Sequence, residues 1–275
     1  MTLRVLVDGI ETDRISVLDR GLSYGDGLFE TIRLVDGRAP LWPRHMHRLA
    51  DGCRRLQLSA PDGAQLWREV EQVSTGMPQA VARITLTRGI GERGYRLPAS
   101  TRPTRVVAAF VPPSVPGDAY VQGLRMRVCE LRLAEQPRLA GIKHLNRLEQ
   151  VLARAEWSDP AIAEGLLRDS HDRVISATMA NLFAVVGGEL LTPALDHCGV
   201  AGVARAEVLA MFPRARVVEL TLDAVSAASE VFLSSSVRGI LPVQSLGGWS
   251  FEPGVIARQL QQHWHNLGFV MEQGG

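Results

Sequence analysis

Lysine is nearly absent from this chain of 275 residues. Lysine and arginine together number 30, and the sequence holds a single lysine, Lys143, so arginine supplies the other 29 cations (30 − 1 = 29). Arginine binds carboxylates and phosphates well because its guanidinium is planar and always charged, but that permanent charge prevents it from acting as an amine nucleophile. A Schiff base to a lysine side chain therefore has one place to form.

Cysteine, net charge and long apolar runs are also scarce. The three cysteines, Cys53, Cys129 and Cys198, are odd in number and widely separated. This pattern fits neither a disulfide framework nor a metal site, and it predicts free thiols in a reducing compartment. A net charge of +1 gives no reason to expect a nucleic-acid or membrane surface. No apolar run approaches the roughly 20 residues of a membrane span, and no basic-then-apolar leader precedes the strand-like residues 3–7. We expect a cytoplasmic enzyme.

The neighbourhood of Lys143 favours amine chemistry. Its approach, residues 139–142, is apolar and contains a glycine. A partly desolvated lysine can lose its proton and condense with a carbonyl group. The alternative is that Lys143 is an ordinary solvated surface residue. Apolar residues follow it at helical spacing, which predicts that it stands just before a helix; they are Leu145, Leu148, Val151, Leu152 and Ala155.

Proline marks the clearest boundary in the chain. Residues 112–117 hold three prolines, which cannot continue a helix or a central strand. Strands and helices alternate on both sides, with several hairpins, which predicts an α/β protein with mixed sheets. We place one domain at residues 1–111, the linker at 112–117, and a second domain carrying Lys143 at 118–275.

Local patterns place several elements. Asp36 and Gly37 between apolar runs favour a hairpin over residues 28–41. Trp42 and Pro43 mark the start of a helix, because proline is well tolerated in the first turn.

Two stretches of the second half have the character of an anion site. Residues 199–205 place glycines before a predicted helix, whose N-terminal N–H groups favour an anion. Ser234, Ser235 and Ser236 supply hydroxyl donors at a strand end. Each pattern alone is more often a plain turn or a solvated strand end. Arg48 is a further candidate for phosphate, although from sequence an exposed helix arginine is the better interpretation.

Residues 88–96 form a loop with three arginines, three glycines and a tyrosine. Arg88, Arg93 and Tyr95 suit a substrate carboxylate, because arginine matches that group with two parallel hydrogen bonds. Solvated loop arginines would look the same. His45 and His47 would face different sides of a helix, so we expect no metal site.

Residues 139–152 closely resemble the lysine segment of the aminodeoxychorismate lyases, a branch of the class IV aminotransferase-like, fold-type IV family of pyridoxal-phosphate enzymes. The resemblance covers nearly the whole chain and includes residues 19–32, 88–95, 180–183, 199–205 and 230–243. It implies a two-domain fold like that of D-amino-acid aminotransferase. It also implies a homodimer with pyridoxal 5′-phosphate bound in the cleft between the domains.

The resemblance implies roles for single residues at the cofactor. Lys143 would bind the cofactor as a Schiff base and then act as acid and base. Arg48 and Ser236 would bind the phosphate, with backbone N–H groups around Val203 and Ala204 completing the cradle.

The resemblance also implies a substrate pocket. Tyr24 and Phe29 would line it, and the loop with Arg88, Arg93 and Tyr95 would reach the carboxylates of a dicarboxylate substrate, often across the dimer interface.

Ser176 departs from the family pattern. Relatives usually have a glutamate here, paired with the pyridine nitrogen of the cofactor. A carboxylate keeps that nitrogen protonated, whereas a hydroxyl would let it stay neutral and weaken the electron sink. We hypothesise that Ser176 favours elimination over transamination.

The resemblance implies a lyase that converts 4-amino-4-deoxychorismate to 4-aminobenzoate, a folate precursor, and pyruvate. A D-amino-acid or branched-chain aminotransferase of the same fold is the first alternative. A degenerate dimer that binds the cofactor without turnover is the second.

Overall fold

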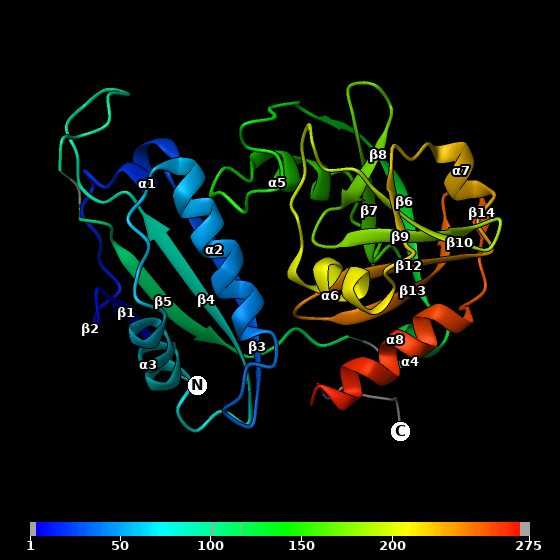
Figure 1. The fold of residues 1–275 in the computed structure, drawn as a ribbon, viewed down its shortest axis with the longest axis horizontal. Helices are drawn as coiled ribbons and strands as arrows, with labels where there is room; N and C mark the ends of the chain where they lie inside the picture. The colour runs from blue at the N-terminus through cyan, green and yellow to red at the C-terminus, as the bar shows by residue number, and fades with distance from the viewer. Residues whose placement is uncertain (1–3, 101, 116, 270–275) are drawn as a thin grey trace. The chain divides into compact units, whose positions relative to one another are not determined.

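The computed structural model describes residues 4–100, 102–115 and 117–269, so Pro116 of the expected linker lies outside the described residues. The chain divides into two compact units (Figure 1). Unit 1 is Met1–Pro112 together with Ile142–Asn146, and unit 2 is Pro113–Gly141 together with Arg147–Gly275. Both units combine helices with a sheet, as the alternation of patterns predicted.

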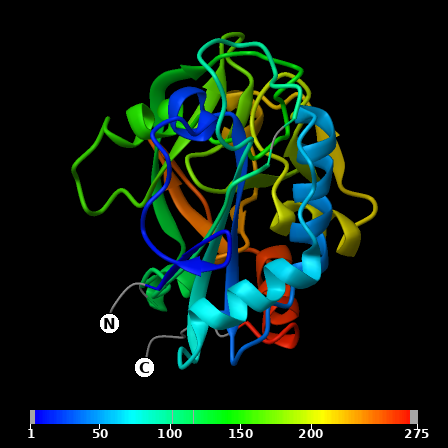
Figure 2. The same cartoon turned by 90° about the vertical axis from the view of Figure 1, so that its left-hand side faces the viewer.

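Unit 1 is an antiparallel five-stranded sheet with two long helices against it (Figure 2). Alternate residues of the two longest strands, such as Ile32 and Ile84, are buried against these helices, as the two-residue period of a strand requires. The strand order is β2-β1-β5-β4-β3. The elements are β1 (Val5–Val7), β2 (Ile10–Glu11), α1 (Arg20–Tyr24), β3 (Gly27–Val35), α2 (Trp42–Leu56), α3 (Gly63–Ser74), β4 (Gln79–Thr87) and β5 (Arg105–Phe110).

The hairpin predicted over residues 28–41 is wrong. Asp36 and Gly37 do form a turn, both with positive φ, but only one bridge, Val35 to Arg38, follows it. The chain then enters α2 at Trp42, as predicted, and β3 pairs along its whole length with the distant β4. A turn signal identifies the turn and not the strand that pairs beyond it.

The segment with Lys143 belongs to unit 1, whereas we expected it in the second domain. The backbone N–H of Phe29 donates to the carbonyl of Lys143 at 3.0 Å, and the N–H of Leu145 donates to the carbonyl of Gly27 at 3.0 Å. His144 forms an antiparallel bridge with Leu28. Residues 142–146 therefore lie along the edge of β3, because that edge strand offers unsatisfied backbone groups.

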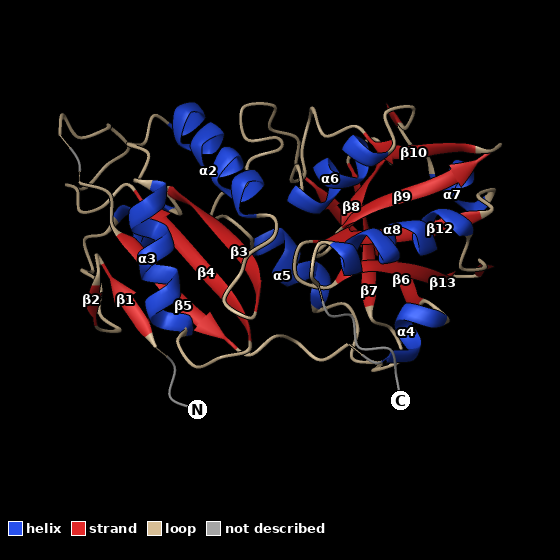
Figure 3. Cartoon of the chain, turned by 60° about the horizontal axis from the view of Figure 1, so that its bottom comes forward, coloured by secondary structure: helices blue, strands red, loops and turns tan. Residues whose placement is uncertain are grey.

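Unit 2 is built on a mixed sheet of nine strands, ordered β11-β10-β9-β12-β13-β6-β7-β8 with β14 paired to β13. Helices α6 and α8 lie against β12 and β13 (Figure 3). The strands are β6 (Leu124–Leu133), β7 (Glu164–Asp169), β8 (Val174–Ala177), β9 (Asn181–Val186), β10 (Glu189–Pro193), β11 (Arg216–Val218), β12 (Glu230–Ser235), β13 (Gly239–Leu246) and β14 (Trp249–Ser250). The helices are α4 (Gly117–Val121), α5 (Leu148–Arg154), α6 (Val203–Met211), α7 (Leu222–Ser226) and α8 (Val255–Asn266).

Helix α5 follows Lys143 as predicted, but its apolar stripe is not buried. Leu148, Val151 and Leu152 are 68%, 61% and 53% exposed. Helical spacing identifies a common face and not what covers that face. None of the described helices is long and apolar enough to cross a membrane.

Candidate active site

Lys143 stands beside an aromatic ring of its own unit. Its Nζ lies 4.1 Å from the centre of the Phe29 ring, a cation–π distance. Lys143 is half-buried and Phe29 is buried. The backbone pairing between residues 142–146 and β3 fixes this approach, so the amine is held by the sheet itself.

Arg83 shares the same ring and was not singled out from the sequence. Its guanidinium carbon lies 4.6 Å from the centre of the Phe29 ring, on the strand that pairs with β3. Among the described residues it has no carboxylate partner, only a long hydrogen bond of 3.5 Å to the Thr85 hydroxyl. Partial burial lowers the pKa of Arg83. A guanidinium without a counterion near an amine is suited to bind an anionic ligand.

Arg48 is anchored by a buried carboxylate. Its Nε donates to Glu30 Oε1 at 2.8 Å, its Nη2 donates to Glu30 Oε2, and the His45 ring nitrogen lies 2.6 Å from the same Oε2. Glu30 and His45 are each 1% exposed. Arg48 is thus a fixed guanidinium and not the solvated helix arginine that its sequence pattern favoured. Glu30 and His45, spaced fifteen residues apart, carried no sequence signal of their own.

The charges of Arg48, Glu30 and His45 determine the protonation state of Glu30. Burial alone would raise the pKa of Glu30, but the charge of Arg48 and hydrogen bonds from Arg48 and His45 lower it to about 2. Burial lowers the pKa of His45, an effect that the neighbouring Glu30 partly offsets. The carboxylate is therefore charged at neutral pH and holds the guanidinium in place.

Arg88 does not present its guanidinium to a substrate, contrary to our expectation. It is 4% exposed and donates to both carboxylate oxygens of Asp26, at 2.7 and 3.0 Å. It also donates to the carbonyls of Leu56 and Gln57, at 2.8 and 2.9 Å. Because these contacts use four of its five N–H groups, Arg88 has a structural role.

The remainder of the arginine loop is open to solvent. Arg93 is exposed and Tyr95 is 87% exposed. The Tyr24 hydroxyl accepts a hydrogen bond from the Gly94 N–H at 3.0 Å, and the rings of Tyr24 and Tyr95 lie 5.5 Å apart. The structure therefore brings Tyr24 together with the loop and presents Arg93 and Tyr95 outwards.

In unit 2, a helix begins at the position where the sequence predicted an anion cradle. Helix α6 begins at Val203, and its N-cap, Gly202, provides no side chain to accept the first N–H groups. Val203 and Ala204 are buried at this helix start. Asn181 supports the approach, since its Nδ2 donates to the Val200 carbonyl at 2.9 Å and a Cβ at Gly202 would lie 2.0 Å from its Oδ1.

Unit 2 also contains serines near the ends of β8 and β12. Ser176 is half-buried in β8, opposite Leu167, and Ser236 is half-buried just after β12. Ser234 is 2% exposed, and its hydroxyl has no hydrogen-bond partner among the described residues. Buried hydroxyls are normally satisfied, so Ser234 and the uncapped start of α6 fit a bound phosphate group.

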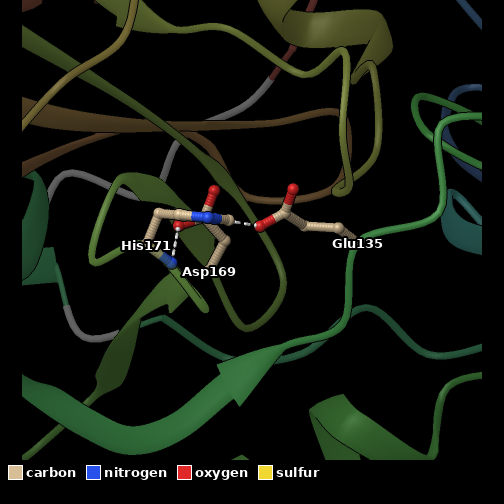
Figure 4. Close-up of side chains that lie close together, drawn as sticks. All are labelled: Glu135, Asp169 and His171. Atoms are coloured by element: carbon tan, nitrogen blue, oxygen red, sulfur yellow. Dashed lines mark hydrogen bonds and ion pairs between the residues drawn. The ribbon is translucent and has the colours of Figure 1, made fainter.

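One group of side chains has the spacing of metal ligands, within the described residues. Ligand atoms of Glu135, Asp169 and His171 lie within 4.8 Å of one another (Figure 4). Arg173 already occupies this group, with Nε 2.6 Å from Asp169 and Nη2 3.2 Å from Glu135. A guanidinium there opposes a second cation, so the group is an ion-pair cluster, and the expectation of no metal stays a prediction.

Comparisons with known proteins agree along nearly the whole chain. Residues 27–246 match the family described as amino-transferase class IV. An aminodeoxychorismate lyase of Vibrio harveyi is 34% identical over 263 residues, covering 93% of this chain and 97% of the relative. The crystal structure of 4-amino-4-deoxychorismate lyase from Pseudomonas aeruginosa has a TM-score of 0.90 and 44% identity, covering 95% of this chain and 98% of that one. The T.th. branched-chain amino acid aminotransferase with pyridoxamine 5′-phosphate, at 21% identity and a TM-score of 0.82, covers 96% of this chain and 93% of that one and shares the fold.

Proposed function

Because the chain belongs to the class IV aminotransferase family, we propose that it is a pyridoxal-phosphate-dependent lyase that converts 4-amino-4-deoxychorismate to 4-aminobenzoate and pyruvate. The two lyases above support this reaction, and the likeness to the crystal structure of the Pseudomonas aeruginosa lyase confirms the expected fold-type IV architecture. The observation that carries the proposal is the single lysine, held beside Phe29 by backbone hydrogen bonds to β3.

In this proposal, single residues have roles toward the cofactor. Lys143 would bind its aldehyde carbon. Arg48, fixed by Glu30, would bind its phosphate together with Ser236 and the N–H groups of Val203 and Ala204. When bound, pyridoxal phosphate supplies an electron sink conjugated to the substrate's amine-bearing carbon.

Lys143 carries the protons of the proposed reaction. As an amine it removes the proton from the ring carbon that bears the substrate's amino group. The C–O bond to the neighbouring enolpyruvyl group breaks, and the ring becomes aromatic. Lys143 then returns a proton to the departing enolpyruvate, giving pyruvate. Aromatisation provides a driving force that transamination lacks.

Arg83 is the residue best suited to bind a substrate carboxylate from within unit 1. It lies beside the ring that Lys143 also contacts and has no carboxylate partner among the described residues. The substrate carries two carboxylates, so we assign one to Arg83 and the other to the exposed Arg93 and Tyr95. Ser176, in place of a carboxylate, would leave the pyridine nitrogen neutral and favour elimination.

A homodimer is part of the proposal. Segments 16–24 and 88–97 are joined by backbone hydrogen bonds, including Arg20 N–H to Gly89 and Gly91 N–H to Leu18. These two segments expose one group of apolar side chains: Val17, Leu18, Leu22, Ile90, Tyr95 and Leu97. Helix α5 exposes a second group: Leu148, Val151 and Leu152. Such groups on a folded protein are typical of an interface. A sedimentation mass of one 30.0 kDa chain for the holoprotein would refute the dimer.

The proposed location is the cytoplasm. Cys53, Cys129 and Cys198 are buried and free, and burial raises the pKa of these thiols to about 11, 12 and 12. Inert thiols of this kind fit a reducing compartment.

The test of the proposed function uses the single lysine. Borohydride reduction of the holoprotein should place a pyridoxyl group on the peptide with Lys143, and aminodeoxychorismate should release pyruvate without any keto acid. Lys143→Ala should lose both the label and the pyruvate. A label on any other peptide, or amino transfer that depends on a keto acid, would refute the proposal.

A further inference from the structure

Glu164 is a wholly buried carboxylate at the start of β7, with 0% of its surface exposed. Its Oε2 accepts hydrogen bonds from the Thr178 hydroxyl at 2.5 Å and from the Thr178 backbone N–H at 3.2 Å. Its Oε1 accepts a hydrogen bond from Arg238 Nη2 at 2.5 Å. One carboxylate therefore joins two segments that are distant in sequence, all within unit 2.

Each partner of Glu164 lies two residues after a proposed cofactor residue. Thr178 follows Ser176, and Arg238 follows Ser236. One oxygen of Glu164 thus binds the segment that we assign to the pyridine end of the cofactor. The other oxygen binds the segment that we assign to its phosphate end. No other described carboxylate is bonded to both Thr178 and Arg238.

The turn with Arg238 is fixed on several sides. The Ser235 hydroxyl accepts hydrogen bonds from the backbone N–H groups of Val237 and Arg238, at 3.3 and 3.4 Å. The Tyr120 hydroxyl donates to the Arg238 carbonyl at 2.8 Å. Because the backbone of this turn is held by these hydrogen bonds, the position of the Arg238 side chain, which Glu164 fixes, also determines the position of the backbone beside Ser236.

We propose that Glu164 is a positioning residue that sets the distance between the Ser176 and Ser236 segments to match the length of the cofactor. This inference rests on the proposed function, because it needs a rigid ligand that contacts both segments. Removing the charge would leave Arg238 without its buried counterion, and a glutamine amide would meet the guanidinium with an N–H donor or lose its bond to Thr178. Either outcome should change the distance between the Ser176 and Ser236 segments.

The experiment titrates the cofactor-free, full-length protein with pyridoxal 5′-phosphate. Glu164→Gln and Thr178→Val should each weaken cofactor binding by about tenfold or more, whereas Thr178→Ser, which keeps the hydroxyl, should stay within about twofold. The absorption band of the bound cofactor should shift in the first two variants and not in the third.

A matched control is Glu69→Gln in unit 1. Glu69 is 5% exposed and pairs with Arg105 at 2.9 Å, so its loss also breaks a buried ion pair. It should lower thermal stability and leave the cofactor dissociation constant unchanged.

The outcomes separate the two proposals. If Glu164→Gln and Thr178→Val lose only thermal stability, like the control, and bind cofactor as the wild type does, the positioning role is wrong while the proposed function stands. If the wild-type protein binds no cofactor, the proposed function fails first. Should Glu164→Gln not fold, Thr178→Val against Thr178→Ser decides the inference alone.

Discussion

The amine of Lys143 and the guanidinium of Arg83 both lie against the ring of Phe29, 4.1 and 4.6 Å from its centre. One aromatic side chain thus adjoins the proposed proton carrier and the proposed carboxylate-binding residue. Phe29→Leu removes the ring and should lower kcat/KM by about tenfold, on the order of 1.4 kcal/mol. Phe29→Tyr keeps the ring and should stay close to wild type in steady-state kinetics. Equal losses in both variants would mean that packing, and not the ring, matters.

Arg83 and Arg88 should respond differently to the same substitution. Arg83→Gln removes a guanidinium that has no carboxylate partner among the described residues, so KM for aminodeoxychorismate should rise by about tenfold with thermal stability unchanged. Arg88→Gln removes the hydrogen bonds of Arg88 to Asp26 and to the carbonyls of Leu56 and Gln57, while Arg20 Nε still donates to Asp26 Oδ2 at 3.0 Å. This loss should cost about 3 kcal/mol in the free energy of unfolding. Kinetics and chemical denaturation of both variants check this. A KM effect confined to Arg88→Gln would reverse our assignment.

Because of Glu30, the free energy of unfolding should decrease as the pH falls into the acidic range. Its folded-state pKa is lowered from 4.5 to about 2, so its contribution is fully present above pH 4.5 and is lost as the pH falls towards 2. The loss over this window is about 3 kcal/mol. Denaturation of the wild type and of Glu30→Gln at several pH values measures it. The variant should be less stable at neutral pH and show a flatter acid dependence; identical slopes would contradict the prediction.

Ser176 should influence the choice of reaction. Ser176→Glu restores a carboxylate of the kind that keeps a pyridine nitrogen protonated, and side transamination should increase. The pyridoxamine form, measured by its absorbance after incubation with substrate, reports the change. Ser176→Ala is the control, since it removes the hydroxyl without adding charge. No increase in the pyridoxamine form of Ser176→Glu would reject the hypothesis.

The sequence predicted the parts of the site that depend on local pattern. The start of α2 at Trp42 and the glycine approach to α6 follow from proline and glycine in characteristic positions. The scarcity of lysine is enough by itself to single out Lys143. None of these features requires knowledge of which distant segments pair.

Features set by pairing between distant segments could not be predicted. The sequence singled out Arg88 for a substrate carboxylate and did not single out Arg83. Only the position of Asp26 makes Arg88 structural, and Arg83 has no carboxylate partner among the described residues. The alternation of β4, which places Arg83 opposite Thr31 on β3, is the signal that could have identified it. The exposure of Leu148 likewise depends on what covers α5, which helical spacing does not specify.

The five residues Ile142–Asn146 belong to unit 1, whereas the chain before and after them belongs to unit 2. This arrangement limits how the protein can be divided into two fragments. A gene cut after Pro112 would encode a first fragment whose β3 edge lacks the pairing of Leu28 with His144. The second fragment would carry the lysine on a segment without the strand that orders it. Separate expression of the two fragments should therefore yield neither half in its native form, and co-expression would have to rebuild the β3 edge before the lysine is in place.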